Sequence, residues 1–297
     1  MELYDWGFHR KCRHEPPYAG CMVGTFAVLG GVLLQMNGAR ALLESLKAEG
    51  VEVVFGYPGG AVLTLYDEVY KMKFPHILTR HEQGAAHAAD GYARASGKVG
   101  VAFATSGPGA TNLVTGIATA HMDSVPMVCI TGQVANPYIG KDSFQEADIV
   151  GITTPITKHN YLVKNVNDIP RVVKEAFYIA RTGRPGVVAI DVAKDVFDAQ
   201  IEYCYPETVE MHGYTGDVPY EVPAVWEAAE ALFAAQRPLL FVGGGVVLSD
   251  TAAYVRELLA LTGMPAVSTL MGLGGVSADT PGYTGMAGMH GTYASNM

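Results

Sequence analysis

The stretch TRHEQGAAHAADGYARASG, residues Thr79–Gly97, decides how the first half of this chain is understood. It follows the short apolar run Phe74–Leu78, which we predict to be a buried strand. From Gln83 onward, alanines and Tyr92 recur at helical spacing, as in a helix packed closely on its neighbours. Glu82 is therefore expected where a strand passes into a helix N-terminus, the place where open α/β sheets carry their chemistry.

Two opposed effects act on a carboxylate at this position. The helix dipole favours the ionised form of Glu82 by roughly 0.3–1 kcal/mol, whereas surroundings of Gly and Ala disfavour it by desolvation. Such a group is suited to proton transfer near neutral pH. The alternative is a glutamate that merely caps the start of a helix, and the stretch alone leaves both interpretations open.

The composition describes a globular protein with a length typical of about two domains. Of the 297 residues, 49% are hydrophobic and only 16% are charged, so material for a core is ample. The net charge of −9, without a basic block, argues against nucleic acid as a partner. The cysteines have no metal-type spacing, which favours free thiols in a reducing compartment, the cytoplasm. They are Cys12, Cys21, Cys129 and Cys204, of which Cys129 lies in a predicted core strand.

Residues 1–35 differ in character from the rest of the chain. Gly20–Gln35 is an apolar, Gly-rich run, which leaves a signal peptide or a membrane anchor open. The run is shorter than the ~20 residues of a spanning helix, and no clear small-residue cleavage site follows it. We prefer to interpret it as an upstream extension, with the natural start at Met36 and no association with a membrane.

From Asn37 onward, helices and strands are predicted to alternate. Asn37 is the expected N-cap of the first helix, Gly50 lies past its end, and Asp168 is the expected cap of a later helix. Strands are expected at 51–55, 74–78, 99–104, 126–131 and 186–192, and later helices end near 70, 122 and 180. Continuously apolar strands separated by helices predict a doubly wound parallel sheet with both faces covered. Residues 133–160 are expected to form an irregular, functional loop.

A second α/β unit is predicted after a linker. Helices are expected at 225–235 and 251–261, strands at 238–242 and 265–270, and a glycine turn at Gly243–Gly245. Two strands and two helices are too little for an ordinary doubly wound domain, so we expect this domain to be truncated. The predicted organisation is an extension (1–35), a first domain (36–200), a linker (201–222) and a truncated central domain (223–297).

Eight short motifs occur in order along the chain. They are YPGG at Tyr57–Gly60, RHEQGAAHAADGYAR at Arg80–Arg94, TSGPGATN at Thr105–Asn112, TGQV at Thr131–Val134, FQE at Phe144–Glu146, TKHNYLV at Thr157–Val163, RPG at Arg184–Gly186 and GMHGT at Gly288–Thr292. One Gly-rich loop is a weak signal, but eight ordered motifs are hard to obtain by chance. From about Met36 to Met297, the chain resembles the catalytic subunits of the acetolactate (acetohydroxyacid) synthase family.

This resemblance implies an enzyme that uses thiamine diphosphate, Mg²⁺ and an FAD that takes no net redox part. Family members decarboxylate pyruvate and join the product to pyruvate or 2-oxobutyrate in branched-chain amino-acid biosynthesis. The resemblance also implies a homodimer or tetramer with the site at a subunit interface, and it leaves room for a small regulatory subunit. By the same comparison, the chain carries the pyrimidine-binding domain and part of the central domain, without the diphosphate-binding domain and its metal ligands.

The resemblance further implies roles for individual residues. Glu82 corresponds to the glutamate that bonds the aminopyrimidine ring, and Gln145 corresponds to the glutamine that reaches the reacting centre. Phe144 and Lys194 correspond to the wall of the substrate channel. The other cofactor positions are Tyr57, Gly59, Gly60, Pro108 and Asn112 for thiamine diphosphate, and Arg184, Gly243, Gly244, Gly245, Thr269, Leu270, Met271, His290 and Gly291 for FAD.

Several of these positions also have ordinary structural interpretations. Pro108 and Asn112 fit a loop and a helix N-cap, Arg184 fits a cation at a helix C-terminus, and Lys194 fits a solvated strand end. His290 between glycines fits a solvated loop, and the glycines at 243–245 lack the full G-x-G-x-x-G spacing.

Departures from the family pattern occur at Asn136–Pro137 and at Ser143, inside the channel-lining loop. Two other interpretations of the whole chain stay open. One is another thiamine-diphosphate 2-oxo-acid decarboxylase, oxidase or acetyltransferase, and the other is a non-catalytic cofactor-binding fragment.

Overall fold

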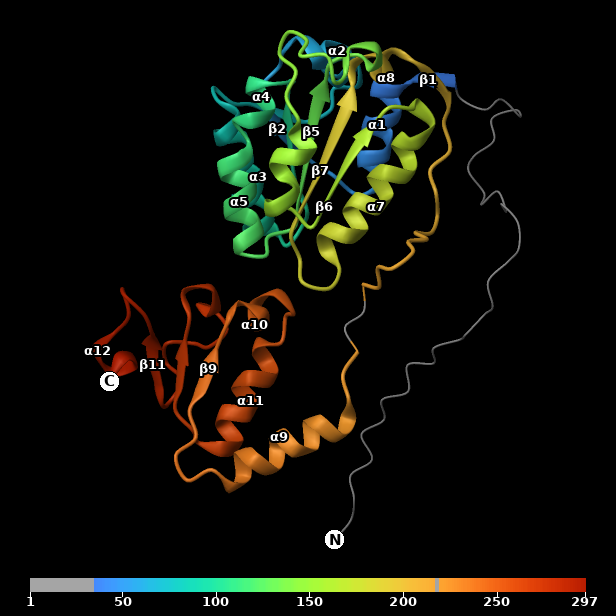
Figure 1. Cartoon of the computed structure of the whole chain (residues 1–297). Helices are drawn as coiled ribbons and strands as arrows, with labels where there is room; N and C mark the ends of the chain where they lie inside the picture. The colour runs from blue at the N-terminus through green and yellow to red at the C-terminus, as the bar shows by residue number, and fades with distance from the viewer. Residues whose placement is uncertain (1–34, 217–218) are drawn as a thin grey trace.

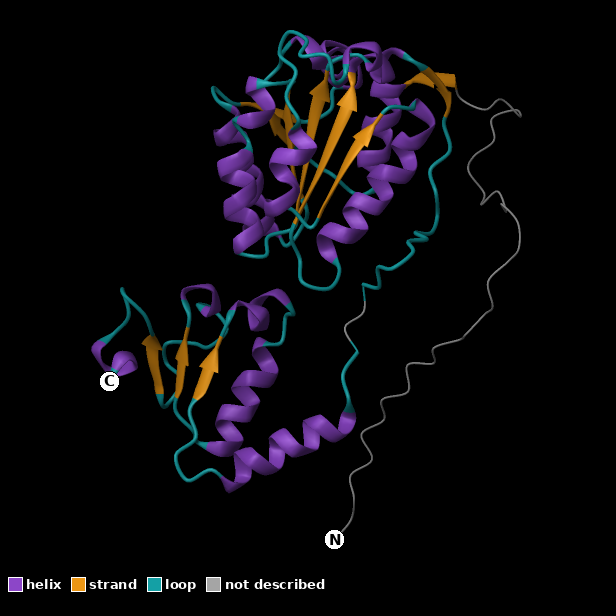
Figure 2. Cartoon of the chain, viewed as in Figure 1, coloured by secondary structure: helices purple, strands orange, loops and turns teal. Residues whose placement is uncertain are grey.

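The computed structural model describes residues 35–216 and 219–297, which form two α/β units (Figure 1). Helices and strands alternate in both units (Figure 2). The predictions for residues 1–34, including Cys12 and Cys21, lie outside the described residues. No helix in the described ranges combines the length and the apolar character needed to cross a membrane.

The first unit is built on a six-stranded sheet with the order β3-β2-β4-β5-β7-β6. Every neighbouring pair in it is parallel, which confirms the predicted doubly wound sheet. The strands are β2 (Val54–Gly56), β3 (His76–Leu78), β4 (Gly100–Ala104), β5 (Met127–Gln133), β6 (His159–Val163) and β7 (Val187–Ala193).

Two hydrophobic cores lie on opposite faces of this sheet because side chains of a strand alternate between faces. In β4, Val101 and Phe103 belong to the first core, whereas Ala102 and Ala104 belong to the second. The first core is covered by α1 (Gly38–Ala48), α2 (Leu63–Met72) and α7 (Ile169–Arg181), and the second by α3 (Glu82–Ser96) and α5 (Val114–Met122). Both faces are buried, which explains why the strands are continuously apolar.

Local predictions of the helix ends are partly confirmed. The Asn37 side chain caps α1 by accepting a hydrogen bond from the Arg40 backbone N–H at 2.8 Å, as predicted. Asp168 precedes α7, but its side chain makes no capping bond and instead accepts from Arg171 Nη2 at 2.9 Å. The helix expected to end near 122 is α5, which ends at Met122 and is preceded by the short helix α4 (Pro108–Thr111).

Two strand predictions were wrong. The run at 74–78 was expected to be buried, but β3 is an edge strand, and Ile77 and Leu78 are more than half exposed. Strand β6 (His159–Val163) was not predicted and begins at the end of the segment expected to be irregular, 133–160, which also contains the short helix α6 (Ile149–Thr153). β6 is partly polar and pairs only with β7, as expected of an edge strand.

The chain closes the first unit with a small antiparallel pair. β1 (Gln35–Asn37) pairs with β8 (Gln200–Glu202), which follows the short helix α8 (Lys194–Asp198). Beyond β8, Tyr203 and Tyr214 pack against the first core. The beginning of the predicted linker therefore lies along the first unit, while the domain bounds themselves stay a prediction.

The second unit has a three-stranded parallel sheet with the order β11-β10-β9. Its strands are β9 (Leu240–Val242), β10 (Ala266–Ser268) and β11 (Tyr283–Met286), and its helices are α9 (Val222–Ala234), α10 (Gly244–Leu248), α11 (Ala252–Thr262) and α12 (Tyr293–Asn296). β11 was not predicted. The buried core is small, comprising Val242, Leu259, Met264, Ala266 and Val276.

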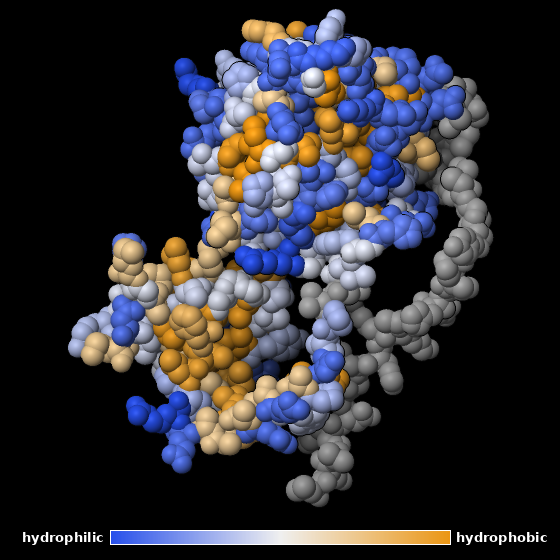
Figure 3. All heavy atoms as spheres, viewed as in Figure 1, coloured by the Kyte–Doolittle hydropathy of each residue, from blue (hydrophilic) through white to orange (hydrophobic). Residues whose placement is uncertain are grey.

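Hydrophobic side chains gather on the visible face of the second unit (Figure 3). Among the large apolar residues exposed in this unit are Trp226, Phe233, Phe241, Tyr254 and Leu261, and α9 contains no buried residue. Exposed apolar area of this kind is typical of a surface that binds other protein.

Candidate active site

The carboxyl ends of the strands of the first sheet form one edge, where α2, α4 and α8 lie (Figure 1). The loops that follow β2, β3, β4, β5 and β7 all leave the sheet there because the strands are parallel. In open α/β sheets, ligands bind at this edge. The motifs YPGG, RHEQ, TSGPGATN and FQE and residue Lys194 all fall on these loops or at the helix starts beside them.

Glu82 is the first residue of α3, as the sequence predicted. Its side chain is buried, with 7% of its surface exposed. Oε2 accepts a hydrogen bond from Asn112 Nδ2 at 2.9 Å. Oε1 faces Gly109, where an added Cβ would lie only 3.2 Å from it, so the glycine keeps this side of the carboxylate free of a side chain. One oxygen of this buried carboxylate is thus held by Asn112, and no side chain at position 109 blocks the other oxygen.

Tyr66 lies close enough to Glu82 to be influenced by its charge. Burial raises the pKa of the Tyr66 phenol far above its usual value, and the negative charge of Glu82 adds to that increase. Tyr66 Oη lies 3.2 Å from His76 Nε2, and burial lowers the pKa of this imidazole, which favours its neutral form. Within the described residues, Glu82 forms no ion pair. In the part of the chain that the structure describes, no ion pair therefore offsets the cost of burying the Glu82 carboxylate.

The TSGPGATN loop approaches its neighbours too closely for side chains at its glycines. Gly107 has a φ of +56°, and a Cβ there would lie 2.5 Å from the Gln145 backbone oxygen. A Cβ at Gly59 would lie 2.4 Å from the side chain of Thr105. Thr105 Oγ1 also accepts a hydrogen bond from the Ala61 backbone N–H at 3.2 Å. Gly59, Gly107 and Gly109 are therefore explained by loop packing at this edge.

A pocket of about 600 Å³ opens beside these loops. It is lined by Gly60, Ala61, Ser106, Val134, Ala135, Tyr138, Ser143, Phe144, Gln145, Lys194, Asp195 and Asp198. The structure thus brings together Gly60, Phe144, Gln145 and Lys194, which are far apart in the sequence. Phe144 is 88% exposed, and Gln145 has a φ of +59°, an uncommon conformation for a residue other than glycine.

The remaining positions expected to contact thiamine diphosphate do not line this pocket, but they lie on loops that contribute residues to it. Pro108 begins α4 and Asn112 follows it, so both lie on the loop that contributes Ser106 to the pocket. Tyr57 and Gly59 lie on the loop that contributes Gly60. The predicted pyrimidine and channel residues are therefore one contiguous group at the edge of the sheet.

Arg184 lies at the opposite end of this sheet, between α7 and the amino end of β7. Its Nε donates to Ser124 Oγ at 2.6 Å, and its Nη2 donates to the Met122 carbonyl at 3.3 Å. The structure therefore places Arg184 and Glu82 at opposite ends of this sheet.

The other residues expected at FAD lie at the carboxyl edge of the second sheet. Gly243 precedes α10, Thr269 follows β10, and His290 follows β11. The position of an added Gly244 Cβ lies 2.9 Å from Met271 Cβ, which places two of the predicted segments in contact. Thr269 Oγ1 caps the following turn by accepting from the Gly272 N–H at 3.0 Å. Leu270 is 67% exposed, and Gly243 and Gly245 have open space where a side chain would be.

The sequence analysis missed a buried polar group within strand β7. Segment 186–192 was predicted to be fully apolar, but Asp191 lies within it and is 2% exposed. Its Oδ1 accepts from Thr131 Oγ1 at 2.6 Å, and its Oδ2 accepts from Gln133 Nε2 at 2.9 Å. Burial raises the pKa of the Asp191 carboxyl to about 6, against the opposing effect of these two hydrogen bonds. A lone Asp in an apolar strand was the only sequence signal for it.

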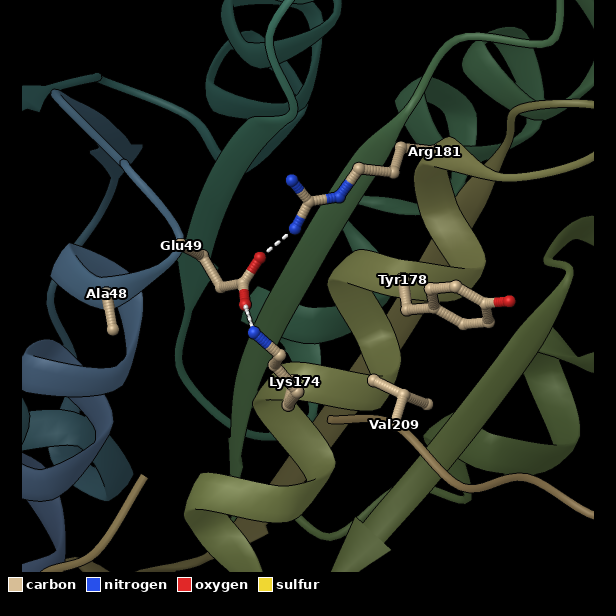
Figure 4. Close-up of a pocket in the computed structure, with 6 residues that line it drawn as sticks. All are labelled: Ala48, Glu49, Lys174, Tyr178, Arg181 and Val209. Carbon is tan, nitrogen blue, oxygen red and sulfur yellow. Dashed lines mark ion pairs between the residues drawn. The ribbon is translucent and has the colours of Figure 1, made fainter. Parts of the chain in front are cut away.

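A second pocket, of about 360 Å³, lies at the end of α1 beside α7 (Figure 4). Lys174 and Arg181 both point at the Glu49 carboxylate, whereas Tyr178 points away from it. Tyr205 Oη also donates to Glu49 Oε1 at 2.7 Å, and the Glu49 side chain is 3% exposed. The carboxylate is thus satisfied by the chain itself, which is typical of a structural ion cluster.

Comparison with known proteins agrees with the arrangement of the two units. The N-terminal TPP binding domain of thiamine pyrophosphate enzymes matches residues 36–152, and the central domain of the same enzymes matches residues 225–297. The chain belongs to the thiamine pyrophosphate enzyme family. The first match includes β2–β5 and the motifs from YPGG to FQE, and the second includes the whole three-stranded sheet.

Within this family of thiamine pyrophosphate enzymes, the chain is similar to acetolactate synthases. It is 53% identical to the acetolactate synthase large subunit IlvB1 of Mycobacterium tuberculosis, over 89% of this chain and 43% of the relative. It is 51% identical to the acetolactate synthase isozyme 2 large subunit of Escherichia coli K12, over 88% of this chain and 47% of the relative. The acetolactate synthase large subunit of Corynebacterium glutamicum is 50% identical, over 88% and 42% of the two chains. The chain thus spans less than half the length of these relatives.

Proposed function

We propose that this chain supplies the pyrimidine-binding side of an acetolactate synthase. The protein decarboxylates pyruvate and joins the resulting two-carbon unit to pyruvate or 2-oxobutyrate. The observation that carries this proposal is the buried Glu82–Asn112 pair beside a pocket lined by Gln145, Phe144 and Lys194. About 50% identity to acetolactate synthases over most of the chain supports the same reaction.

Glu82 and its neighbours fit the aminopyrimidine half of thiamine diphosphate. When bound, this cofactor supplies the nucleophilic carbon and the electron sink for decarboxylation. Glu82 would share a proton with a ring nitrogen of the cofactor through one carboxylate oxygen, while Asn112 Nδ2 donates a hydrogen bond to the other oxygen at 2.9 Å. Gly109 admits the ring because no side chain stands at 3.2 Å from Oε1. The buried setting excludes water from this proton transfer.

The pocket beside Glu82 is proposed as the substrate channel. Gln145 presents its amide from a loop held against Gly107, and an amide can donate to the oxygen of a 2-oxo acid. Lys194 supplies the positive charge that attracts a carboxylate substrate. Phe144 forms an apolar wall at the mouth of the pocket. These side chains would orient the 2-oxo acid substrate, and Glu82 would exchange the proton with the cofactor.

FAD is proposed to lie between Arg184 and the carboxyl edge of the second sheet. Gly243 and Gly245 leave the backbone accessible at the start of α10, where N–H groups favour phosphate. Thr269, Leu270, Met271, His290 and Gly291 follow strands of the same sheet and would contact the remainder of the flavin cofactor. Arg184 retains donors beyond its bonds to Ser124 and Met122, and these suit a phosphate. Mg²⁺ is proposed to join the diphosphate through ligands outside this chain.

A second copy of the chain is the proposed cover for the open side of the site. Leu63, Tyr70, Ile77 and Leu78 are exposed on α2 and on edge strand β3, directly before Glu82. An exposed apolar edge strand is unfavourable unless another chain covers it. A homodimer or tetramer with the site at its interface meets that need. The names of the relatives from E. coli and C. glutamicum call them large subunits, so we also propose a small regulatory partner.

The test is the product formed by the natural full-length protein. Pyruvate with thiamine diphosphate, Mg²⁺ and FAD should yield 2-acetolactate, and added 2-oxobutyrate should yield 2-aceto-2-hydroxybutyrate. Release of acetaldehyde alone would identify a decarboxylase, and acetyl phosphate or acetate would identify an acetyltransferase or an oxidase. Either result would overturn the proposed ligation.

A further inference from the structure

We propose that Gln133 is a positioning residue for the loop that carries Gln145. Gln133 is the last residue of β5, and its side chain is 4% exposed. Its Nε2 donates to Asp191 Oδ2 at 2.9 Å and to the Ala147 carbonyl oxygen at 2.9 Å. One buried amide thus joins β7 to the end of the loop. The catalytic part of this inference rests on the proposed function, whereas the structural part does not.

The orientation of the Gln133 amide is fixed by Asp191. An ionised carboxylate only accepts hydrogen bonds, so the NH₂ group of Gln133 must face it. The opposite atom, Oε1, accepts from the Val134 backbone N–H at 2.8 Å. Every polar atom of Gln133 is therefore satisfied, and a flipped amide would place donors against donors and acceptors against acceptors. Fully satisfied buried networks of this kind specify one conformation.

The loop between β5 and α6 is held together by its own hydrogen bonds and is attached to the rest of the unit near its two ends. Glu146 accepts hydrogen bonds from the backbone N–H groups of Ser143 and Gly140, which ties the loop to itself, and these bonds lower the Glu146 pKa. At its beginning, the Asn136 N–H donates to Asp195 Oδ1 at 3.0 Å, which anchors the loop to α8. At its end, Gln133 holds Ala147, two residues after Gln145.

Release of the Ala147 anchor is expected to move Gln145 without unfolding the sheet. The Gln145 backbone packs closely against Gly107. A shift of the loop would therefore also move Gln145. A displacement of about 1 Å at a reacting group can cost up to ~10²-fold in rate. Phe144 lies beside Gln145 in the same loop, so substrate affinity should also fall.

The experiment compares two variants of the natural full-length protein. Gln133→Met keeps the length of the side chain but removes both donors, and so frees Ala147 as well as Asp191 Oδ2. Thr131→Val removes the 2.6 Å bond to Asp191 Oδ1 but leaves both bonds of Gln133 intact. Both variants disturb the buried carboxylate, and only the first releases the loop. Gln133→Asn is a further variant that keeps an amide too short to reach Ala147 and Asp191 together.

Amide hydrogen exchange and steady-state kinetics are the two measurements. We expect Gln133→Met and Gln133→Asn to accelerate exchange at residues 140–147 by at least about tenfold relative to β5 and β7. Thr131→Val should leave that ratio unchanged. For acetolactate formation by folded enzyme, the two Gln133 variants should lose about tenfold or more in kcat and raise KM for pyruvate, unlike Thr131→Val.

The two measurements separate failure of this inference from failure of the proposed function. Equal loop exchange in the Gln133 variants, Thr131→Val and the unaltered protein would overturn the positioning role. Unchanged kcat and KM in both Gln133 variants with a faster-exchanging loop would also overturn it. A protein that makes no acetolactate at all would refute the proposed reaction, while the exchange result would still decide whether Gln133 holds the loop.

Discussion

Two buried carboxyl groups at the same edge of one sheet have different surroundings and different expected roles. Glu82 begins a helix and has one oxygen bonded to Asn112, with the other next to Gly109. Asp191 lies inside a central strand, and both its oxygens accept hydrogen bonds from neighbouring strand residues. Glu82 has one carboxylate oxygen without a hydrogen bond from the described part of the chain, so a ligand can bind it. Both oxygens of Asp191 already accept hydrogen bonds from the chain. Burial alone therefore does not identify a catalytic acid.

Replacement of Glu82 by Gln should abolish turnover in the natural full-length protein. The amide keeps the shape of the side chain but cannot exchange a proton with a ring nitrogen, and losses of ~10²–10⁴-fold are usual for such groups. The measurement is kcat for acetolactate formation together with the melting temperature. Glu175→Gln is the matched control, because Glu175 is also buried on a helix but bonds Tyr161 and Arg171. Near-normal turnover of the Glu82 variant would contradict the proton-relay role.

Asp191 should make stability fall as the pH rises. Burial raises its pKa from 3.8 to about 6, so the folded state favours the protonated acid more than the unfolded chain does. That stabilisation is complete below a pH of about 4 and is lost as the pH rises through about 6. The wild-type minus Asp191→Asn difference in unfolding free energy should therefore decrease by up to about 3 kcal/mol between these limits.

Denaturant titrations of both proteins across this pH range provide the check on Asp191. Thr131→Val is expected to enlarge the decrease, because the Thr131 hydrogen bond lowers the Asp191 pKa. A difference that stays flat with pH would mean that Asp191 does not titrate in this range.

At the scale of secondary-structure elements, the sequence was most informative where both sides of a strand are buried. β4, β5 and β7 were predicted within two residues because their runs are apolar on both faces. β3 and β6 are edge strands, and their exposure and mixed polarity removed that signal. Gly59 and Gly107 lie in loops that the sequence predicted, and a Cβ at either position would meet a neighbouring segment of the chain.

Gly107 should tolerate alanine far less well than Gly97 does. Both have positive φ, +56° and +71° respectively, so both substitutions carry backbone strain of about 1 kcal/mol or more. Only at Gly107 would the new Cβ also meet a backbone atom, the Gln145 oxygen at 2.5 Å, whereas Gly97 has open space.

Gly107→Ala is therefore expected to destabilise the fold by about 1–3 kcal/mol more than Gly97→Ala. It should also lower acetolactate formation by folded enzyme, because the loop that carries Gln145 must move. Urea unfolding and kcat of the two variants provide the comparison. Equal effects at the two glycines would show that the Gly107–Gln145 contact is not tight in solution.

At the scale of the whole molecule, the sequence predicted only those residues of the candidate site that lie in recognisable motifs. The motifs YPGG, RHEQ, TSGPGATN and FQE fall at the carboxyl edge of the sheet, where the structure brings Gly60, Ser106, Gln145 and Lys194 to one pocket. The polar network of Thr131, Gln133 and Asp191 was missed, because strand pairing between β5 and β7 decides which side chains meet. Register of this kind is a property of the folded sheet and has no short-range sequence signal.

Residues 1–297 expressed alone should bind thiamine diphosphate weakly and should make no acetolactate. Glu82 and Asn112 address the pyrimidine, whereas most of the charge of the cofactor lies on its diphosphate. Magnesium needs several oxygen ligands besides the phosphates, and within 35–216 and 219–297 no group of three or more His, Cys, Asp or Glu residues is placed to hold a metal ion. Calorimetric titration with and without Mg²⁺ is the measurement. Micromolar binding that depends on Mg²⁺, or acetolactate from this chain, would contradict the prediction and favour a complete site.

The two units of the chain should also unfold separately, the second before the first. The hydrophobic core of the second unit is the small cluster of Val242, Leu259, Met264, Ala266 and Val276, and all of α9 remains at least partly exposed. Leu42→Ala and Leu259→Ala each remove a buried leucine, from the first and second cores respectively. Each is expected to cost about 2–5 kcal/mol, and each should shift only the transition of its own unit. Far-ultraviolet circular dichroism and hydrogen exchange during urea unfolding report the two transitions. One transition that both variants shift equally would show instead that the small second core is stabilised by cooperation with the first.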